Sequence, residues 1–190
     1  YGQMLERIVI LAMRRHGHAG GDRGHACIEV RPSAEDDRER IGEILLNSGL
    51  FHEIDVATVD EMFVQTYARP ITRDSYRFLS CWETIEGAAP RMIGFACFGL
   101  ESLTQDTWDL FWVCALPSSR GRGVGAALMR EAVDVATREN GRLMVIYTSS
   151  TAPYAPARRL YESQGFTRAA VIEGYYADGD DLNIFSRRLR

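Results

Sequence analysis

A glycine-rich segment between an apolar run and a helical pattern constrains the fold of this chain more than any other feature. Residues 120–126 read RGRGVGA, follow the apolar run 110–116, and open a helical repeat through Leu128, Val133 and Ala136. Glycines let a backbone approach a ligand closely, and the free N–H groups at a helix start attract phosphate oxygens. The segment is typical of a pyrophosphate site or of a tight strand-to-helix connection.

Three phosphate-binding patterns compete for this segment. A P-loop requires Lys followed by Ser or Thr after its last glycine, where this chain has two alanines. The dinucleotide fingerprint fits Gly121, Gly123 and Ala126, but too short a stretch follows for the strands and helices of a dinucleotide-binding half-sheet. The pattern Arg/Gln-x-x-Gly-x-Gly/Ala is filled by Arg120, Gly123 and Gly125.

Hydrophobic periodicity and turn residues predict strands and helices in a mixed order. Short connections predict antiparallel pairing of the consecutive strands 76–84, 91–100 and 107–115. Ser33 is expected to cap the first helix and acidic residues to follow it, and the second helix is expected over 56–67, before Pro70. The other strands are expected at 27–31, 143–148, 167–174 and 182–189, and the other helices from the glycine segment to Asn140-Gly141 and from about Pro156.

These motifs together resemble the GCN5-related N-acetyltransferases (GNAT superfamily), from about Ile28 to Leu189. The segment WDLFWVCA at 108–115 resembles the family's fourth strand, and ARRLYESQGF at 157–166 resembles its late helix with a Gly-Phe exit. The resemblance implies an α/β fold: a mixed, largely antiparallel sheet flanked by helices, in which the parallel fourth and fifth strands splay apart around acetyl-coenzyme A. No metal is expected.

The resemblance also assigns the residues that bind the coenzyme. The loop would hold the pyrophosphate, and backbone groups of the fourth strand would bond the pantetheine arm. The expected cofactor-binding residues are Val113, Cys114, Ala115, Arg120, Gly121, Arg122, Gly123, Val124, Gly125 and Ala126.

Acetyl transfer to an amine requires proton removal from the amine and an acid for the departing thiolate. Tyr161 lies where the family places a tyrosine near the coenzyme sulfur, and an unperturbed phenol, with a pKa near ~10, is protonated at neutral pH. Many relatives carry a glutamate on the fifth strand where this chain has Tyr147, a poor base unless its pKa is strongly perturbed. Asp109, Glu101 or a water held by Tyr147 and Ser149 are therefore the alternatives, and Asp109 is preferred.

Aromatic walls with carboxylates suit a small amine that is charged until it binds. The expected substrate-binding residues are Phe51, Tyr147, Ser149 and Tyr176. The predicted function is acetyl-CoA-dependent acetylation of a primary amine of a small molecule or amino acid by direct attack. Two alternatives stay open: a peptide or protein N-terminal or lysine acetyltransferase, suggested by the Tyr-Tyr segment, and a non-catalytic acyl-CoA-binding regulatory domain, suggested by the missing glutamate.

Composition limits the partners. The chain has 190 residues, 46% of them hydrophobic, and a formal net charge of −4, which suits one well-buried domain, expected over residues 27–190. The charge and the lack of a basic run argue against nucleic acid or an anionic membrane surface. No apolar run approaches the ~18 residues of a spanning helix, so a cytoplasmic protein is expected. The scattered cysteines are expected to be mostly buried thiols, and a homodimer is conceivable because relatives often pair through late strands.

Residues 1–26 look appended to this domain. Apolar residues recur at helical spacing within 3–15, and four glycines within 17–24 indicate a flexible linker. We expect an N-terminal helix and linker that could end a fused or upstream domain. The first 16 residues faintly resemble the last helix of D-alanine–D-alanine ligase-like proteins, which would make an ATP-grasp ligase a fused or neighbouring partner.

Overall fold

A computed structural model describes residues 27–190, so the helix and linker expected over 1–26 lie outside the described residues. The described part has one seven-stranded sheet in the order β1-β2-β3-β4-β5-β7-β6. The strands are β1 (Cys27–Pro32), β2 (Arg77–Thr84), β3 (Arg91–Leu100), β4 (Thr107–Ala115), β5 (Leu143–Ser149), β6 (Thr167–Ala177) and β7 (Asp180–Arg188). The helices are α1 (Arg38–Asn47), α2 (Glu53–Tyr67), α3 (Val124–Arg138) and α4 (Ala155–Ser163).

The sheet is antiparallel except at its centre. β1, β2, β3 and β4 pair antiparallel in chain order. For β2, β3 and β4 this confirms the expectation from their short connections. β4 and β5 are parallel, and β7 pairs antiparallel with both β5 and β6. This is the mixed, largely antiparallel arrangement predicted from the motifs.

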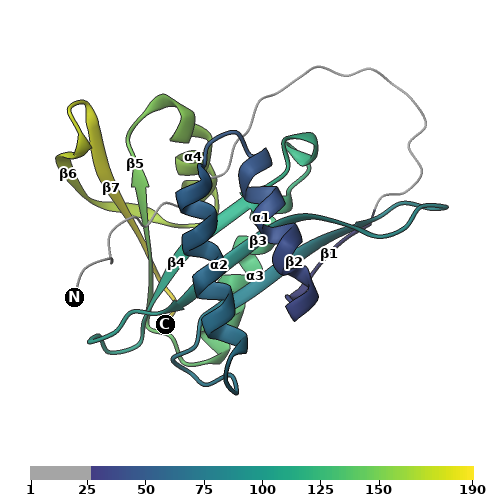
Figure 1. Ribbon diagram of the computed structural model, residues 1–190. Coiled ribbons are helices and arrows are strands. Elements are labelled where there is room, and N and C mark those ends of the chain that lie inside the picture. Colours follow the sequence, from purple (N-terminus) through teal and green to yellow (C-terminus); the bar gives the residue numbers. More distant parts are fainter. Residues whose placement is uncertain (1–26) are drawn as a thin grey trace.

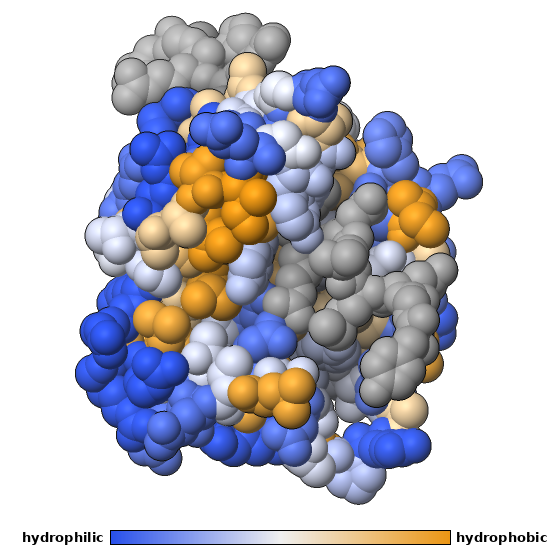
Figure 2. Space-filling view, turned by 90° about the vertical axis from the view of Figure 1, so that its left-hand side faces the viewer, coloured by the Kyte–Doolittle hydropathy of each residue, from blue (hydrophilic) through white to orange (hydrophobic). Residues whose placement is uncertain are grey.

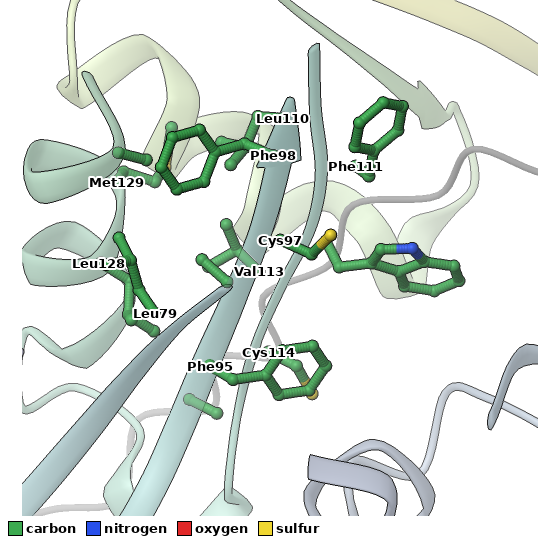
Figure 3. Packing of buried hydrophobic residues seen from close by; sticks show 14 of the residues in the cluster. Leu79, Phe95, Cys97, Phe98, Leu110, Phe111, Val113, Cys114, Leu128 and Met129 are labelled. Carbon is green, nitrogen blue, oxygen red and sulfur yellow. The ribbon is translucent and has the colours of Figure 1, made fainter. Parts of the chain in front are cut away.

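Helices cover both faces of the sheet. Figure 1 shows α1 and α2 crossing one face and α3 lying against the other. The helix α3 buries a stripe at helical spacing, Leu128, Met129, Ala132, Val133 and Ala136, because its hydrophobic residues recur with the helical period. In Figure 3, Leu128 and Met129 face the side chains of Phe98 and Val113, whereas Phe111 points away from this helix.

The first two helices begin differently from the sequence prediction. The expected Ser33 cap is wrong: its hydroxyl is hydrogen-bonded to Ser80 at 2.6 Å, and a 3-10 turn at Glu35–Asp37 precedes α1. The carboxylate of Asp37 instead accepts the Ala34 N–H at 3.0 Å. The second helix begins at Glu53, three residues earlier than predicted, because the Asp55 carboxylate accepts the His52 N–H at 2.8 Å.

The far edge of the sheet is the most exposed part of the strands. Among the described strands β6 pairs with β7 alone, and its side chains are almost all exposed, including those of Val171 and Ile172. Figure 2 looks at the molecule from the side on which β6 and β7 lie and shows hydrophobic patches between hydrophilic ones. No helix among residues 27–190 is long and apolar enough to cross a membrane.

Candidate active site

The two central strands part soon after they meet. Their parallel register has only the pairs Thr107↔Leu143, Trp108↔Met144 and Asp109↔Val145. Beyond Asp109, no register pair joins β4 to another described strand on this side, although β4 continues to Ala115. The backbone of Val113, Cys114 and Ala115, the predicted coenzyme contacts, therefore belongs to the diverging part of β4.

A bulge at Phe111 changes the direction of the side chains in this diverging part. Cys97 pairs with Trp112 and Phe98 with Leu110, so Phe111 is an extra residue on β4. After the bulge, Trp112 contacts the Phe51 ring at 5.2 Å and the Cys114 thiol lies 3.7 Å from the Ile44 carbonyl of α1. The α1–α2 side of β4 is thus an aromatic wall.

The glycine segment folds into a tight turn that begins α3. Gly121 (φ +74°) and Gly123 (φ +81°) are left-handed, a conformation that favours glycine. Within residues 27–190, an added Cβ at either glycine would meet no atom within 4 Å. The first helical hydrogen bond runs from the Ala127 N–H to the Gly123 carbonyl at 2.9 Å. The preceding N–H groups, at Val124, Gly125 and Ala126, have no acceptor within the helix and can receive an anion.

The two arginines of the segment are bonded to other parts of the protein. Arg120 donates to the Ser48 carbonyl at the end of α1, at 3.1 Å. Arg122 is ion-paired with Glu83 of β2, which also pairs with Arg91 at 2.9 Å. The hydrogen bond from Arg122 is the main cause that lowers the pKa of the buried Glu83 carboxyl. Both arginines were predicted to bind the coenzyme, and that role stays a prediction.

Tyr161 is fully buried on α4. Its ring contacts Phe185 of β7 at 5.5 Å. Burial raises the pKa of the phenol well above its ordinary value, while a hydrogen bond with Thr148 of β5 and the nearby Arg158 guanidinium lower it. The side chain therefore remains protonated throughout the ordinary pH range, as a general acid must before it acts.

Asp109 and Tyr147 lie on the same face of the sheet, at the point where it opens. Asp109 is fully buried and pairs in register with Val145. Residues two apart on a strand share a face, so the side chain of Tyr147 lies on the same face as those of Val145 and Asp109. Burial raises the pKa of the Cys97 thiol, and the adjacent Asp109 carboxylate raises it further. The two residues predicted to handle the amine are thus positioned by neighbouring strands.

The predicted substrate residues occupy three different settings. Phe51 is buried in the loop before α2, against Trp112. The Ser149 hydroxyl donates to Asp180 of β7 at 2.5 Å, and its oxygen accepts the Thr151 N–H at 3.0 Å, so it joins β5 to the last hairpin. Tyr176 packs edge-on against Tyr175 at 4.9 Å on β6. Their contact with substrate stays a prediction.

Two residues of this region were missed by the sequence reasoning. Thr148 and Glu83 are both buried polar residues, one bonded to Tyr161 and the other paired with Arg122. Nothing in the local sequence marks Glu83, because its partner is 39 positions away. Thr148 is adjacent to Tyr147 and could have been found from strand alternation, since it faces away from the amine side.

The cysteines behave as packing residues. Cys81, Cys97 and Cys114 are buried, as expected, and Cys27 is exposed. Burial raises the pKa of Cys81 to about 11 and that of Cys114 to about 12, so neither thiol ionises readily at neutral pH. Within the described residues, no group of three or more His, Cys, Asp and Glu side chains gathers as a metal site.

These features fit acetyl-CoA in three ways. The start of α3 offers backbone N–H groups to a diphosphate, the glycines leave room for it, and the diverging part of β4 offers backbone groups to an extended arm. The motifs predicted this arrangement, in which the fourth strand diverges from the fifth beside the glycine turn.

Comparison with known proteins identifies the family. Residues 46–166 match the sequence profile of the Acetyltransferase (GNAT) family, so the chain belongs to this family. An N-alpha-acetyltransferase of Saccharolobus solfataricus is 31% identical over 77 residues, which are 40% of this chain and 46% of that protein. The match thus spans just under half the length of this curated relative.

Solved structures agree with this assignment. A GNAT-family acetyltransferase of Desulfovibrio desulfuricans is 28% identical, with a TM-score of 0.77 over 86% of this chain and 100% of the other. An acetyltransferase of Salmonella typhimurium with its cofactor acetyl-CoA has a TM-score of 0.67 at 22% identity, covering 86% and 95%. The ribosomal-protein-S18-alanine N-acetyltransferase of Escherichia coli has a TM-score of 0.66 at 19% identity, covering 86% and 94%. The last two show a shared fold.

Proposed function

We propose that the chain is an acetyl-CoA-dependent N-acetyltransferase that transfers the acetyl group directly to a primary amine of a small molecule or amino acid. The single observation that carries this proposal is the opening of β4 from β5 beside the glycine turn that starts α3. Family membership and the Salmonella typhimurium structure with acetyl-CoA support it.

In this proposal the donor lies along the opening. The N–H groups that begin α3 bind its diphosphate, helped by the positive end of the helix dipole. Backbone groups of Val113, Cys114 and Ala115 bond the pantetheine arm. A backbone N–H near Ala115 donates a hydrogen bond to the carbonyl oxygen as negative charge develops on it.

Proton transfers are assigned to the side chains at the opening. Asp109 accepts a proton from the incoming ammonium, and the neutral amine attacks the thioester carbon to form a tetrahedral intermediate. The carbon–sulfur bond then breaks as Tyr161 gives its proton to the departing sulfur. The nitrogen loses its second proton through water as the amide forms, and a proton from water restores the phenol of Tyr161. Burial keeps the phenol of Tyr161 protonated before the transfer, and the hydrogen bond with Thr148 and the nearby Arg158 guanidinium, which lower its pKa, favour release of the proton.

A second candidate is acetylation of the α-amine of a peptide or protein. The 31% identity to an N-alpha-acetyltransferase favours it. The buried position of Phe51 against Trp112 favours the small amine instead, because this pair closes the wall against which a peptide backbone would lie. A panel that contains free amino acids, polyamines, peptides with free N-termini and lysine peptides separates the two candidates.

The test of the proposal combines binding and turnover. Calorimetric titration should show one acetyl-CoA per chain, and the amine panel should release CoA with at least one acceptor. Tyr161→Phe should keep donor affinity and lower kcat by about 10²-fold, a typical contribution of a general acid. Binding without turnover for every acceptor would support the regulatory alternative, and the absence of binding would refute the proposal.

A further inference from the structure

The glycine segment has little to hold its own conformation. Gly121 and Gly123 are both left-handed, and no atom of the described part of the chain lies within 4 Å of the place where a Cβ would be. Glycines lose the most conformational freedom when a turn is fixed, so a turn of this kind costs free energy to order. Arg122 lies between the two glycines, and its side chain is therefore the one that can tie the middle of the turn to the sheet.

The partner of Arg122 is well placed to hold it. The Glu83 side chain is 2% exposed, at the end of β2, and each of its carboxylate oxygens pairs with a different arginine. Arg91 of β3 lies opposite Glu83 in the strand register, so it belongs to the sheet and fixes the carboxylate from one side. Arg122 reaches the other oxygen from the turn. Charged hydrogen bonds to a desolvated carboxylate are stronger than those at an exposed surface.

We propose that Glu83 is a positioning residue for the acetyl-CoA loop: its buried carboxylate holds Arg122 and so fixes the turn that presents the N–H groups of α3 to the diphosphate. This inference rests on the proposed function. Arg120 anchors the start of the same turn through the Ser48 carbonyl. The two arginines therefore tether the turn to α1 and β2, and the backbone is left to bind the anion.

A direct contact between Arg122 and the diphosphate makes the opposite prediction for Glu83. If Arg122 had to leave Glu83 to reach the ligand, the carboxylate would compete with the diphosphate, and its neutralisation would tighten donor binding. If Glu83 positions the turn, its neutralisation loosens the turn and weakens binding. The sign of the change in affinity therefore separates the two roles.

The experiment uses Glu83→Gln and Arg122→Gln, with Glu139→Gln as the matched control. Glu139 follows α3 and pairs at 2.9 Å with Arg77, which lies on β2 as Glu83 does; the Glu139 side chain is 30% exposed. Arg77 lies at the beginning of β2 and Glu83 near its end, so the control removes an ion pair of β2 without touching the turn. Arg122→Gln removes the same ion pair by changing the half-buried arginine, and it leaves Glu83 bonded to Arg91. It therefore serves as a second variant if Glu83→Gln folds poorly.

Two readouts decide the outcome. Calorimetry should show that Glu83→Gln and Arg122→Gln each raise the Kd for acetyl-CoA by about tenfold, the effect expected when a binding loop must be ordered on binding. KM for acetyl-CoA should rise while kcat at saturating donor changes little, and the control should match the wild type. Hydrogen exchange of the ligand-free protein should be faster at the amides of 121–125 in both variants.

Each alternative outcome has a distinct meaning. Tighter donor binding by Glu83→Gln, or unchanged exchange at 121–125 in both variants, would overturn the positioning role and leave the proposed function standing. Failure of the wild-type chain to bind acetyl-CoA would overturn the proposed function and this inference together.

Discussion

The chemistry of Tyr161 follows from where its hydroxyl lies. The phenol is removed from water between α4 and β7, and its hydrogen bond with Thr148 connects it to β5. Desolvation disfavours the phenolate, so the protonated form persists above the pH at which a free tyrosine ionises. An acid of this kind remains available over the whole working range of an enzyme.

This environment predicts a particular pH dependence. The pKa of Tyr161 is raised, so the side chain loses its proton only at pH values above the pKa of free tyrosine, which is about 10. We expect kcat to show no descending limb from this group between about pH 7 and pH 9.5. Tyr161→Phe should lower kcat by a similar factor across that interval. A descending limb in the wild type that disappears in Tyr161→Phe would contradict the raised pKa.

Asp109→Asn tests the assigned base. The amide keeps the size of the side chain but cannot take a proton, so we expect kcat/KM for the amine to fall by about 10²-fold while acetyl-CoA affinity stays near the wild-type value. The rate of the variant should rise with pH over a wider interval, because only amine that is already neutral can react. An unchanged pH profile with an unchanged rate would exclude Asp109 as the base.

Sequence reasoning succeeded where a residue's neighbours in the chain determine its role. The glycines at 121 and 123 were expected to form a loop that opens a helix, and the loop with positive φ angles at both glycines leads into α3. The partners of Arg122 and Tyr161 depended on contacts between distant strands and helices, which no local pattern records. The same limit explains the incorrect cap at Ser33, whose hydroxyl bonds to Ser80 across the sheet.

At the scale of elements, the position of α3 depends on its close approach to the sheet. Gly94 of β3 has no side chain, and a Cβ there would come within 2.8 Å of the Cys114 carbonyl oxygen and of Val124 Cγ1. Cys114 belongs to the diverging part of β4 and Val124 is the first residue of α3. One glycine therefore sets the spacing between the turn and the opening.

Gly94→Ala should push these elements apart. We expect a loss of about 1–3 kcal/mol in the free energy of unfolding, because the backbone oxygen cannot move as easily as a side chain, together with weaker acetyl-CoA binding. Gly42→Ala is the control: a Cβ in α1 would lie 3.4 Å from Val56, an ordinary contact, and alanine favours the helix. Urea titration measures the free energy of unfolding of both variants. Equal stability of the two variants would refute the close-packing argument.

The order of elements was more predictable than their ends. Strands 91–100 and 107–115 were expected at the bounds that the structure shows. The last two strands differ at the hairpin, where β6 extends to Ala177 and β7 begins at Asp180. Ala177 pairs directly with Asp180 around the left-handed Gly179. The sequence of this hairpin is typical of a turn, so the prediction ended the first strand too early and began the second too late.

At the scale of the whole sheet, two groups of strands meet at a narrow junction. β1 to β4 form one group and β5 to β7 the other, joined by the register pairs at Thr107, Trp108 and Asp109. A ligand that bonds to β4 in the opening and also reaches Tyr161, whose ring packs against Phe185 of β7, would contact both sides of this junction. Its binding should therefore stabilise the fold as a unit.

Acetyl-CoA should raise the unfolding temperature of the chain in a concentration-dependent way. A ligand that binds the folded state alone, at 100 times its Kd, adds about 2.7 kcal/mol to the free energy of unfolding. Thermal unfolding with acetyl-CoA, CoA and inorganic phosphate measures the effect. We expect a large shift with the first two and a small one with phosphate. Equal shifts with phosphate and acetyl-CoA would mean that only the helix N-terminus binds.

The extra residue at Phe111 also limits how this strand can change during evolution. Removal of that one residue would leave Leu110 opposite Phe98 and Trp112 opposite Cys97, so the later side chains would keep their sides, but the strand would lose the bend that a bulge gives it. Loss of one residue after the bulge, such as Val113, would instead direct Cys114 at α3, because alternation there is regular. Homologous strands can therefore diversify by substitution at each position, whereas a gain or loss of a single residue after Trp112 would turn the end of β4 inside out.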